Sequence, residues 1–330
     1  MPWASTVPFN IWFVSTLIFT VFFWLRWPKQ TAVAALIWID YALYQLFWFL
    51  TLNWLFPNYY LRLLPIALPF ALLLYWRRRL EPNPIVGRPR APLWPDQHPL
   101  TRVWLIGGGL VLAALVYFNV RVLLSYRQDS PSGEKVLLLT PVRIGAYVVV
   151  NGGNARQGWG MNDHWNALPW TENPPDEQEA YAVDFVEFNT SGTMMTSLIR
   201  GSRQSYQGYM DQIYAPCPGA VVKIVDGYPE ALPPAPGETE LGNYLVLQCN
   251  KFYVTIGGFK NESFNVKEGD QVRFSTQLGM VGASGNPSIP HVHVHATVNG
   301  LTGEPVPILF DGIFAVDQFA VRNQIFIPQN

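Results

Sequence analysis

The chain has 330 residues, a net charge of −1, and 49% apolar residues, of which many are aromatic. A charge so near zero provides no basic surface, so we exclude a nucleic-acid partner. With only two cysteines, Cys217 and Cys249, the chain has no disulfide framework. The length suits about two domains, and the apolar residues gather in the N-terminal third.

The first 126 residues are expected to be embedded in a membrane. A helix needs roughly 20 apolar residues to cross a bilayer, and Trp and Tyr crowd the segment ends as they do at membrane interfaces. Asp40, inside the second segment, marks either a functional group or a helix-packing position. We expect four membrane spans, at 9–25, 31–56, 59–76 and 103–126.

Basic residues between the spans predict the orientation. Arg26 and Lys29 follow the first span, and six arginines between Arg77 and Arg102 follow the third. Because cytoplasmic loops collect Lys and Arg, both loops are expected inside the cell. The N-terminus and everything after Tyr126 are then expected outside. His98 lies in the second basic loop, where we expect a solvated residue.

The remainder, 127–330, is expected to be a mainly-β domain. From Lys135 onward, short β-branched runs alternate with Gly, Pro and Asn at hairpin-like spacing. No long helical periodicity competes, so the pattern predicts an antiparallel sheet sandwich or an open barrel. A Pro-rich insertion, Gly227–Gly242, is either a surface loop or an overhang above a binding groove.

The stretch PHVHVHA places three of the chain's five histidines within five residues. Valine favours strands, and side chains two apart on a strand share a face. His291, His293 and His295 should therefore form a row, with the valines directed into a core. A solvated, histidine-rich strand face is one interpretation. A metal or proton-transfer site is the other, and it explains the choice of imidazole better.

Two other stretches supply groups that a metal site needs. Asp184 lies in the strand-like YAVDF, pointing away from the core side chains, and His164 lies in the loop-like NDHWN. A catalytic zinc ion takes three ligands from His, Asp or Glu and leaves a fourth position for water. His164, Asp184 and one of the strand histidines meet that count. Asp184 alone would also fit the polar face of an edge strand.

These motifs together resemble the lysostaphin/LytM-type zinc metallopeptidases, which cut peptidoglycan cross-bridges. YAVDF is similar to their Asp-bearing strand, YAPCPGAVVKIV and GNYLVLQC to the next two strands, and VKEGDQV with LGMVGASGNPSIPHVHVHA to their closing run. The blocks follow the family's order between about Val142 and Phe326. The resemblance implies Asp184 and His293 as zinc ligands and His291 as the catalytic histidine beside the metal.

The chain departs from the family pattern at two positions. Much of the family has its third ligand four residues before the Asp, where this chain has Ala180, so His164 is the remaining candidate. The family also has a histidine after its GNxVxl strand, at or near the place of Gly258. We therefore expect weak, zinc-dependent hydrolysis that Gly258→His would increase. His295 either orients a ligand or the substrate, or is an exposed residue at the strand end.

Two functions follow from the resemblance. The first is a membrane-anchored zinc endopeptidase on the periplasmic side of a bacterial inner membrane, acting on peptidoglycan stem or cross-link peptides. The second is a degenerate, non-hydrolytic relative that binds wall peptides or regulates other cell-wall hydrolases. A third hypothesis makes the spans the working part, but beyond Asp40 they show no polar pattern that suggests a conduction path.

The resemblance also bears on the two cysteines. Cys217 and Cys249 lie near the ends of strands that pair in the related fold, and outside the cell thiols can be oxidised. We expect a disulfide between them. Two buried free thiols are the alternative.

Overall fold

The computed structural model describes residues 7–25, 31–55, 58–80, 99–165, 177–196, 203–230, 241–274, 276–285, 289–311 and 318–328. The chain divides into two compact units. One is helical and comprises residues 6–54 and 60–122; the other is mainly β and comprises residues 1–5, 55–59 and 123–330. His98 and most of the Pro-rich insertion lie outside the described residues.

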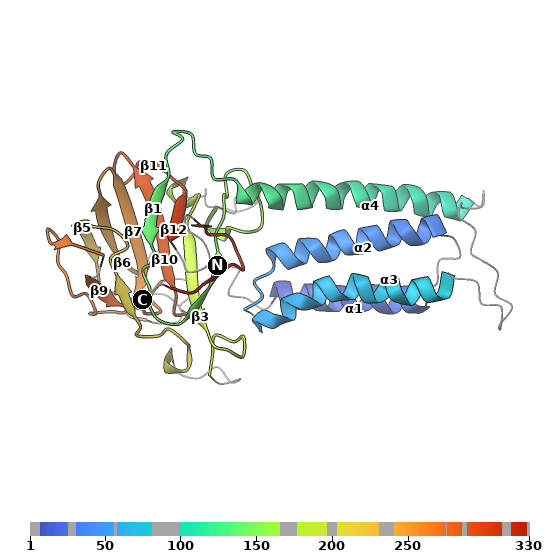
Figure 1. The fold of residues 1–330 in the computed structure, drawn as a ribbon, viewed down its shortest axis with the longest axis horizontal. Coiled ribbons are helices and arrows are strands. Elements are labelled where there is room, and N and C mark those ends of the chain that lie inside the picture. The colour runs from blue at the N-terminus through green and yellow to red at the C-terminus, as the bar shows by residue number, and fades with distance from the viewer. Residues whose placement is uncertain are drawn as a thin grey trace. The chain divides into compact units, whose positions relative to one another are not determined.

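The helical unit consists of long apolar helices that Figure 1 shows running roughly parallel. Large apolar side chains cover their outer surfaces: Ile18, Phe70 and Leu110 are 62%, 60% and 68% exposed. A helix that is apolar on all sides needs an apolar surrounding, as in a membrane. The helices are α1 (Val7–Leu25), α2 (Thr31–Thr51), α3 (Leu64–Leu80), which follows the 3-10 turn η2 (Tyr59–Leu63), and α4 (Pro99–Leu123).

Three helices in the described part are long and apolar enough to cross a membrane, namely Ala32–Thr51, Tyr59–Arg78 and Thr101–Tyr126. Three of the four predicted spans are therefore matched. Of the first, the described stretch Pro8–Phe22 is apolar but shorter than a span, so the count of four is not confirmed. At about 1.5 Å per residue, the 19 residues of α1 come close to the roughly 30 Å of a hydrocarbon core.

Asp40 of α2 borders an open cavity of about 560 Å³ that residues of α1, α2 and α4 line. Its Oδ1 is buried and has no hydrogen-bond partner within the described helices. Gly108 of α4 packs beside it, since an added Cβ would lie 2.7 Å from Leu36 Cδ2 and 3.5 Å from Asp40 Oδ2. The glycine thus allows α4 to approach α2 at this level, and Asp40 lies at a helix-packing position.

The β unit consists of short strands and 3-10 turns. The turns are η3 (Leu124–Tyr126), η4 (Asp163–Trp165), η5 (Glu177–Glu179) and η6 (Arg203–Ser205). The strands are β1 (Val136–Leu139), β2 (Ala146–Asn151), β3 (Val183–Phe188), β4 (Gln212–Tyr214), β5 (Gly219–Val225), β6 (Asn243–Cys249), β7 (Phe252–Phe259), β8 (Gln271–Val272), β9 (Gln277–Met280), β10 (Val292–Val298), β11 (Glu304–Pro305), β12 (Ile308–Asp311), β13 (Gln318–Phe319) and β14 (Ile325–Phe326).

One large sheet dominates the β unit, with the strand order β14-β2-β3-β10-β7-β6-β5-β8 and β11 paired to β10. Its described pairings are antiparallel. Two smaller sheets, β1-β12-β13 and β4-β9, accompany it. The mainly-β prediction is confirmed. The parallel pairing of β1 with β12 was not expected, because strands far apart in sequence carry no local signal of direction.

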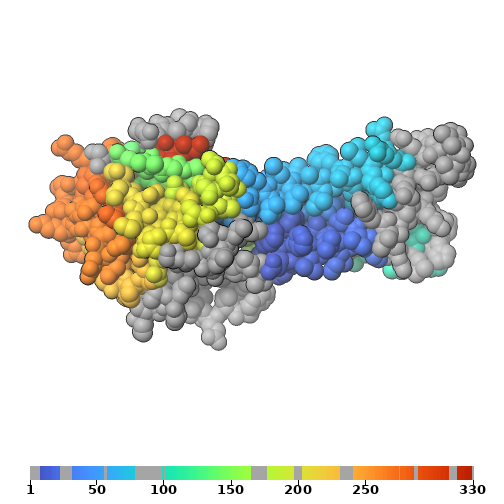
Figure 2. All heavy atoms as spheres, turned by 90° about the horizontal axis from the view of Figure 1, so that it is seen from below, coloured from blue at the N-terminus to red at the C-terminus, as the bar shows by residue number. Residues whose placement is uncertain are grey.

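The core of the β unit lies between the large sheet and the small ones. Val292 and Val294 of β10 and Phe185 of β3 pack in one cluster with Leu138 of β1 and Phe310 of β12. The large sheet remains open because β14 and β8 are its outer strands, so the arrangement is a sandwich and not a closed barrel. Figure 2 shows the unit as a closely packed body whose visible face consists largely of its yellow and orange segments.

Cys217 and Cys249 are joined by a disulfide in this core. Cys249 ends β6 and Cys217 precedes β5, and these two strands are antiparallel neighbours. The two Cα atoms are 6.0 Å apart, a spacing that suits a disulfide. The expected pairing therefore matches the strand register, and the redox state in the cell stays a prediction.

Candidate metal centre

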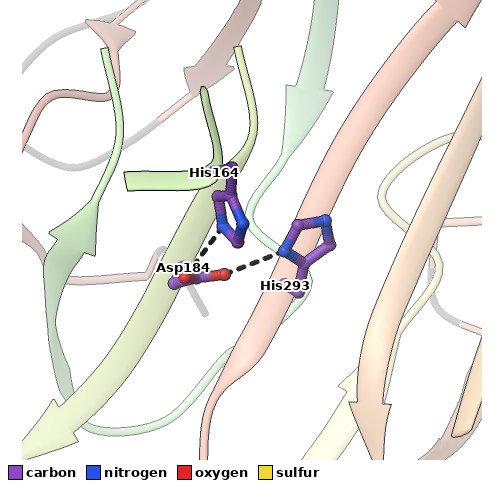
Figure 3. A group of neighbouring side chains, drawn as sticks. All are labelled: His164, Asp184 and His293. Carbon is purple, nitrogen blue, oxygen red and sulfur yellow. Dashed lines mark hydrogen bonds and ion pairs between the residues drawn. The ribbon is translucent and has the colours of Figure 1, made fainter. Parts of the chain in front are cut away.

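Two adjacent strands at the middle of the large sheet bring Asp184 and His293 together. His293 of β10 lies directly opposite Asp184 of β3. Their neighbours Val183, Val292 and Val294 enter the core, so Asp184 and His293 point to the other face. Nδ1 of His293 is 2.9 Å from Oδ1 of Asp184, and a dashed line marks this contact in Figure 3.

His164 joins this pair from a different part of the chain. It lies in the 3-10 turn η4 and not on a strand, and its Nε2 is 3.0 Å from Oδ2 of Asp184. In Figure 3 dashed lines join the carboxylate of Asp184 to both imidazoles. The structure therefore brings together all three predicted metal ligands, and each is buried: His164, Asp184 and His293 are 8%, 0% and 2% exposed.

Two buried asparagines hold the loop that carries His164. Asn151, at the end of β2, accepts a hydrogen bond from the Asp163 backbone N–H at 2.5 Å and donates to Asp184 Oδ2 at 3.3 Å. Asn162 accepts from the His164 backbone N–H at 3.1 Å and donates to the carbonyl of Ala182 at 3.2 Å. The loop is thereby tied both to Asp184 and to the segment that precedes β3.

Arg322, from the C-terminal segment, fastens the same loop. Its guanidinium is buried and lies 2.6 Å from Asp163 Oδ2, next to His164. It also donates to the carbonyls of Val150 and Gly160, each at 2.9 Å. This role could not be predicted from the sequence, because a single arginine 159 residues from its partner forms no motif.

His291 precedes β10 directly and is buried beside the other histidines. Its Nδ1 lies 2.7 Å from the carbonyl oxygen of Ile289. Since a carbonyl only accepts, Nδ1 carries the proton and the lone pair of the neutral ring is on Nε2. Burial lowers the pKa of His291 below its usual value, which favours the neutral ring that a proton acceptor requires.

The three strand histidines are all buried, so the solvated-face interpretation is wrong. His295 extends the row on β10, with its Nδ1 2.9 Å from His293 Nε2.

Glu179 is a residue of this site that the sequence did not predict. Its Oε2 lies 3.1 Å from His164 Nδ1, and its Oε1 lies 4.0 Å from His293 Nε2. The only available signal was its place one residue before Ala180, the position of the family's missing histidine.

The charges of this cluster depend on one another. Burial raises the pKa of Asp184, but His164 and His293 outweigh this effect and hold it well below its usual value. Burial also raises the pKa of Glu179, and the nearby imidazoles, His164 first, lower it to about 2. Both carboxylates are therefore charged, and both attract a cation.

The chemistry of the donor set fits a zinc ion. The side-chain ligand atoms of His164, Asp184 and His293 all lie within 4.8 Å of one another. Two imidazole nitrogens and one carboxylate are the ligands that a catalytic zinc site uses. The nitrogens that face Asp184 are Nε2 of His164 and Nδ1 of His293, and these atoms would bind the ion.

Gly258 has no room for a side chain. Its φ is +81°, and an added Cβ would come closer than 3.0 Å to the carbonyl oxygen of His291. L residues rarely adopt this conformation, and the carbonyl belongs to the backbone that positions His291. A histidine at this position would therefore be strained, and the expectation that Gly258→His increases hydrolysis stays a prediction that this geometry opposes.

Residues 205–305 match the family model described as Peptidase family M23. The chain carries an M23 peptidase domain. The match includes His291, His293, His295 and Gly258, whereas His164 and Asp184 lie before it. The comparison with curated proteins finds no match.

Several solved structures are similar to the chain. One is a zinc containing peptidase from Vibrio cholerae, at 18% identity and a TM-score of 0.31, with 51% of this chain and 37% of that chain covered. The catalytic domain of the prophage-encoded M23 protein EnpA from Enterococcus faecalis gives 17% identity, a TM-score of 0.29, and coverages of 44% and 85%. The catalytic domain of lysostaphin from Staphylococcus simulans has 22% identity and a TM-score of 0.24, with 37% of this chain and 68% of that chain covered. These similarities are too low to support an argument, so the family match carries the assignment.

Proposed function

We propose that this protein is a membrane-anchored zinc metalloendopeptidase that hydrolyses peptide bonds in peptidoglycan stem or cross-link peptides. The observation that carries the proposal is the convergence of His164, Asp184 and His293 beside His291. The M23 match adds the family whose chemistry such a site performs.

The residues of the site have two roles: some would bind the metal ion, and one transfers a proton. The atoms that would hold the ion are His164 Nε2, a carboxylate oxygen of Asp184, and His293 Nδ1. When bound, zinc supplies polarisation of the scissile carbonyl and a lowered pKa for a water molecule. His291 Nε2 takes the proton of the attacking water and then stabilises the oxyanion as an imidazolium.

The proposed location follows from the apolar helices and the basic loops. Described helices are long enough to cross a membrane, and Arg and Lys gather in the two loops assigned to the cytoplasm. The β unit would then lie on the periplasmic side of a bacterial inner membrane, in the compartment that contains peptidoglycan.

The test is the release of fragments from purified peptidoglycan by the full-length protein in detergent, measured by mass spectrometry. We expect fragments from the zinc-loaded wild type, none after chelation, and recovery when zinc is added. Asp184→Ala should bind no zinc and release nothing. Asp226→Asn, at an exposed acid of the same unit, is the control and should match the wild type. A zinc-loaded wild type that releases nothing would refute the peptidase.

A second candidate function is a non-hydrolytic domain that binds wall peptides or regulates other hydrolases. Two observations favour it: Gly258 cannot supply the family's further histidine, and the metal-binding side chains are almost fully buried. A substrate reaches such ligands only when covering groups move aside. Sedimentation with intact sacculi, without release of fragments, would identify this function.

A further inference from the structure

Both proposed metal-binding histidines direct their outer ring nitrogens toward one buried carboxylate. Nδ1 of His164 lies 3.1 Å from Glu179 Oε2, and Nε2 of His293 lies 4.0 Å from Glu179 Oε1. The shorter contact lacks the alignment of a linear hydrogen bond, and it is an ion pair only when the His164 ring is protonated. Glu179 ends the 3-10 turn η5, which thus places one carboxylate behind two imidazoles.

His295 meets the same nitrogen of His293. If Nδ1 of His293 binds the ion, its ring proton is on Nε2, which must then donate. Nδ1 of His295 lies 2.9 Å away, so it accepts, and the proton of the neutral His295 ring is on Nε2. This assignment leaves each ring of the pair with one defined tautomer.

We propose that Glu179 and His295 are positioning residues that fix the tautomers and orientations of His164 and His293 for the metal ion. The inference rests on the proposed metal centre, and it assigns to these residues no contact with the ion. An acceptor behind a metal-binding imidazole makes the ring a stronger ligand and prevents its rotation.

The burial of both residues supports this role. Glu179 is 7% exposed and His295 is 5% exposed. A buried carboxylate is costly unless a partner compensates for its lost hydration, and the imidazoles of the metal centre are the partners that the structure places beside it. Glu177, on the same turn, is exposed and offers a matched control.

The same geometry has a competing explanation. The ligand atoms of Glu179, His293 and His295 also lie within 4.8 Å of one another, so they could hold a second ion with His293 as a bridge. Metal stoichiometry separates the two explanations. The positioning role requires one equivalent of zinc per chain, and a bridged pair requires two.

The experiment measures zinc affinity and stoichiometry of the full-length protein in detergent, using a competing chromophoric chelator, and the visible spectrum of the Co2+ form. Glu179→Gln keeps the side-chain volume but puts an NH2 donor where one acceptor oxygen lies. His295→Phe keeps a ring but removes the acceptor. We expect one equivalent in the wild type, about 10- to 100-fold weaker binding in both variants, and altered Co2+ spectra. Glu177→Gln should leave both the zinc affinity and the Co2+ spectrum unchanged.

Each result has a defined meaning. Unchanged affinity and spectra in both variants would overturn the positioning role, although the metal centre and the peptidase proposal would stand. Two equivalents in the wild type, one of them lost in both variants, would replace it with the bridged pair. A wild type that binds no zinc would overturn the metal centre itself. The unfolding temperature of the metal-free variants separates misfolding from lost affinity, since a purely structural role would lower that temperature and leave the Co2+ spectrum unchanged.

Discussion

Replacing Arg322 tests how the loop that carries His164 is held in place. The guanidinium pairs with Asp163 at 2.6 Å, and both side chains are nearly buried, at 5% and 8% exposed. Arg322→Ala leaves the Asp163 carboxylate buried without this cation and removes the donors to two backbone carbonyls. Breaking a buried pair by removing one partner costs about 3–5 kcal/mol.

The loss should appear in unfolding and in metal binding. For a domain of 150–250 residues, 1 kcal/mol lowers Tm by about 2–4 °C, so we expect Arg322→Ala to lower the Tm of the metal-free protein by roughly 10 °C. Zinc affinity should fall as well, because Asp163 adjoins His164. Adding Asp163→Asn removes the stranded charge and should recover part of the Tm.

A surface pair provides the control. Arg127 and Asp129 lie 3.0 Å apart with side chains 57% and 45% exposed, and exposed pairs contribute about 0–1 kcal/mol. Arg127→Ala should therefore lower Tm by no more than about 4 °C and leave zinc affinity unchanged. If Arg322→Ala gives the same small Tm change as Arg127→Ala, with unaltered zinc binding, then Arg322 does not hold the loop.

Three other predictions concern the β unit. Burial first, and then Asp211, raise the pKa of Glu187 from 4.5 to about 7, so the folded state binds the extra proton between these values and stability should fall as pH rises through them. Because Glu187 is partly exposed, we expect only about 1 kcal/mol. Glu187→Gln should flatten the Tm-against-pH curve between pH 4.5 and 7.5, and equal slopes in both proteins would contradict this. Gly258→Ala should lower stability by at least about 1–3 kcal/mol, because φ there is +81°, and a Gly258→His protein that folds and hydrolyses faster would show that the backbone adapts. Protein unfolded without reductant should resist alkylation at Cys217 and Cys249, and reduction should cost about 3–4 kcal/mol; labelling of both thiols before reduction would exclude the disulfide.

Periodicity made the strand part of the site predictable. A strand alternates its faces with a period of two, so the valines of PHVHVHA and the apolar neighbours of Asp184 determined which side chains share a face. The structure has His293 and Asp184 as direct cross-strand partners, which the alternation alone could not give. Register between strands 109 residues apart depends on the whole sheet.

Glu179 and Arg322 could not be predicted from local patterns. Each acts through a contact between distant segments: Glu179 reaches His293 on β10, and Arg322 reaches Asp163 across 159 positions. Neither residue lies in a periodic run, and isolated charged residues are usually solvated. The helical part shows the reverse case, since composition alone indicated apolar helices, and three of them are long enough to cross a membrane.

His164 shows how the centre obtains a ligand that its strand does not provide. In much of the family, the histidine lies on the same segment as the Asp, at the position of Ala180. Here Ala180 is buried, and its carbonyl accepts from the Ala155 backbone N–H at 3.0 Å, which places the loop 151–165 against this segment. His164 then reaches Asp184 from the loop across 20 positions. Asp184 and His293 keep their relative position as long as the sheet exists, but His164 keeps its own only while Asn151, Asn162 and Arg322 hold the loop. Metal affinity in this protein should therefore respond to the loop's polar contacts more than to the sheet's apolar core.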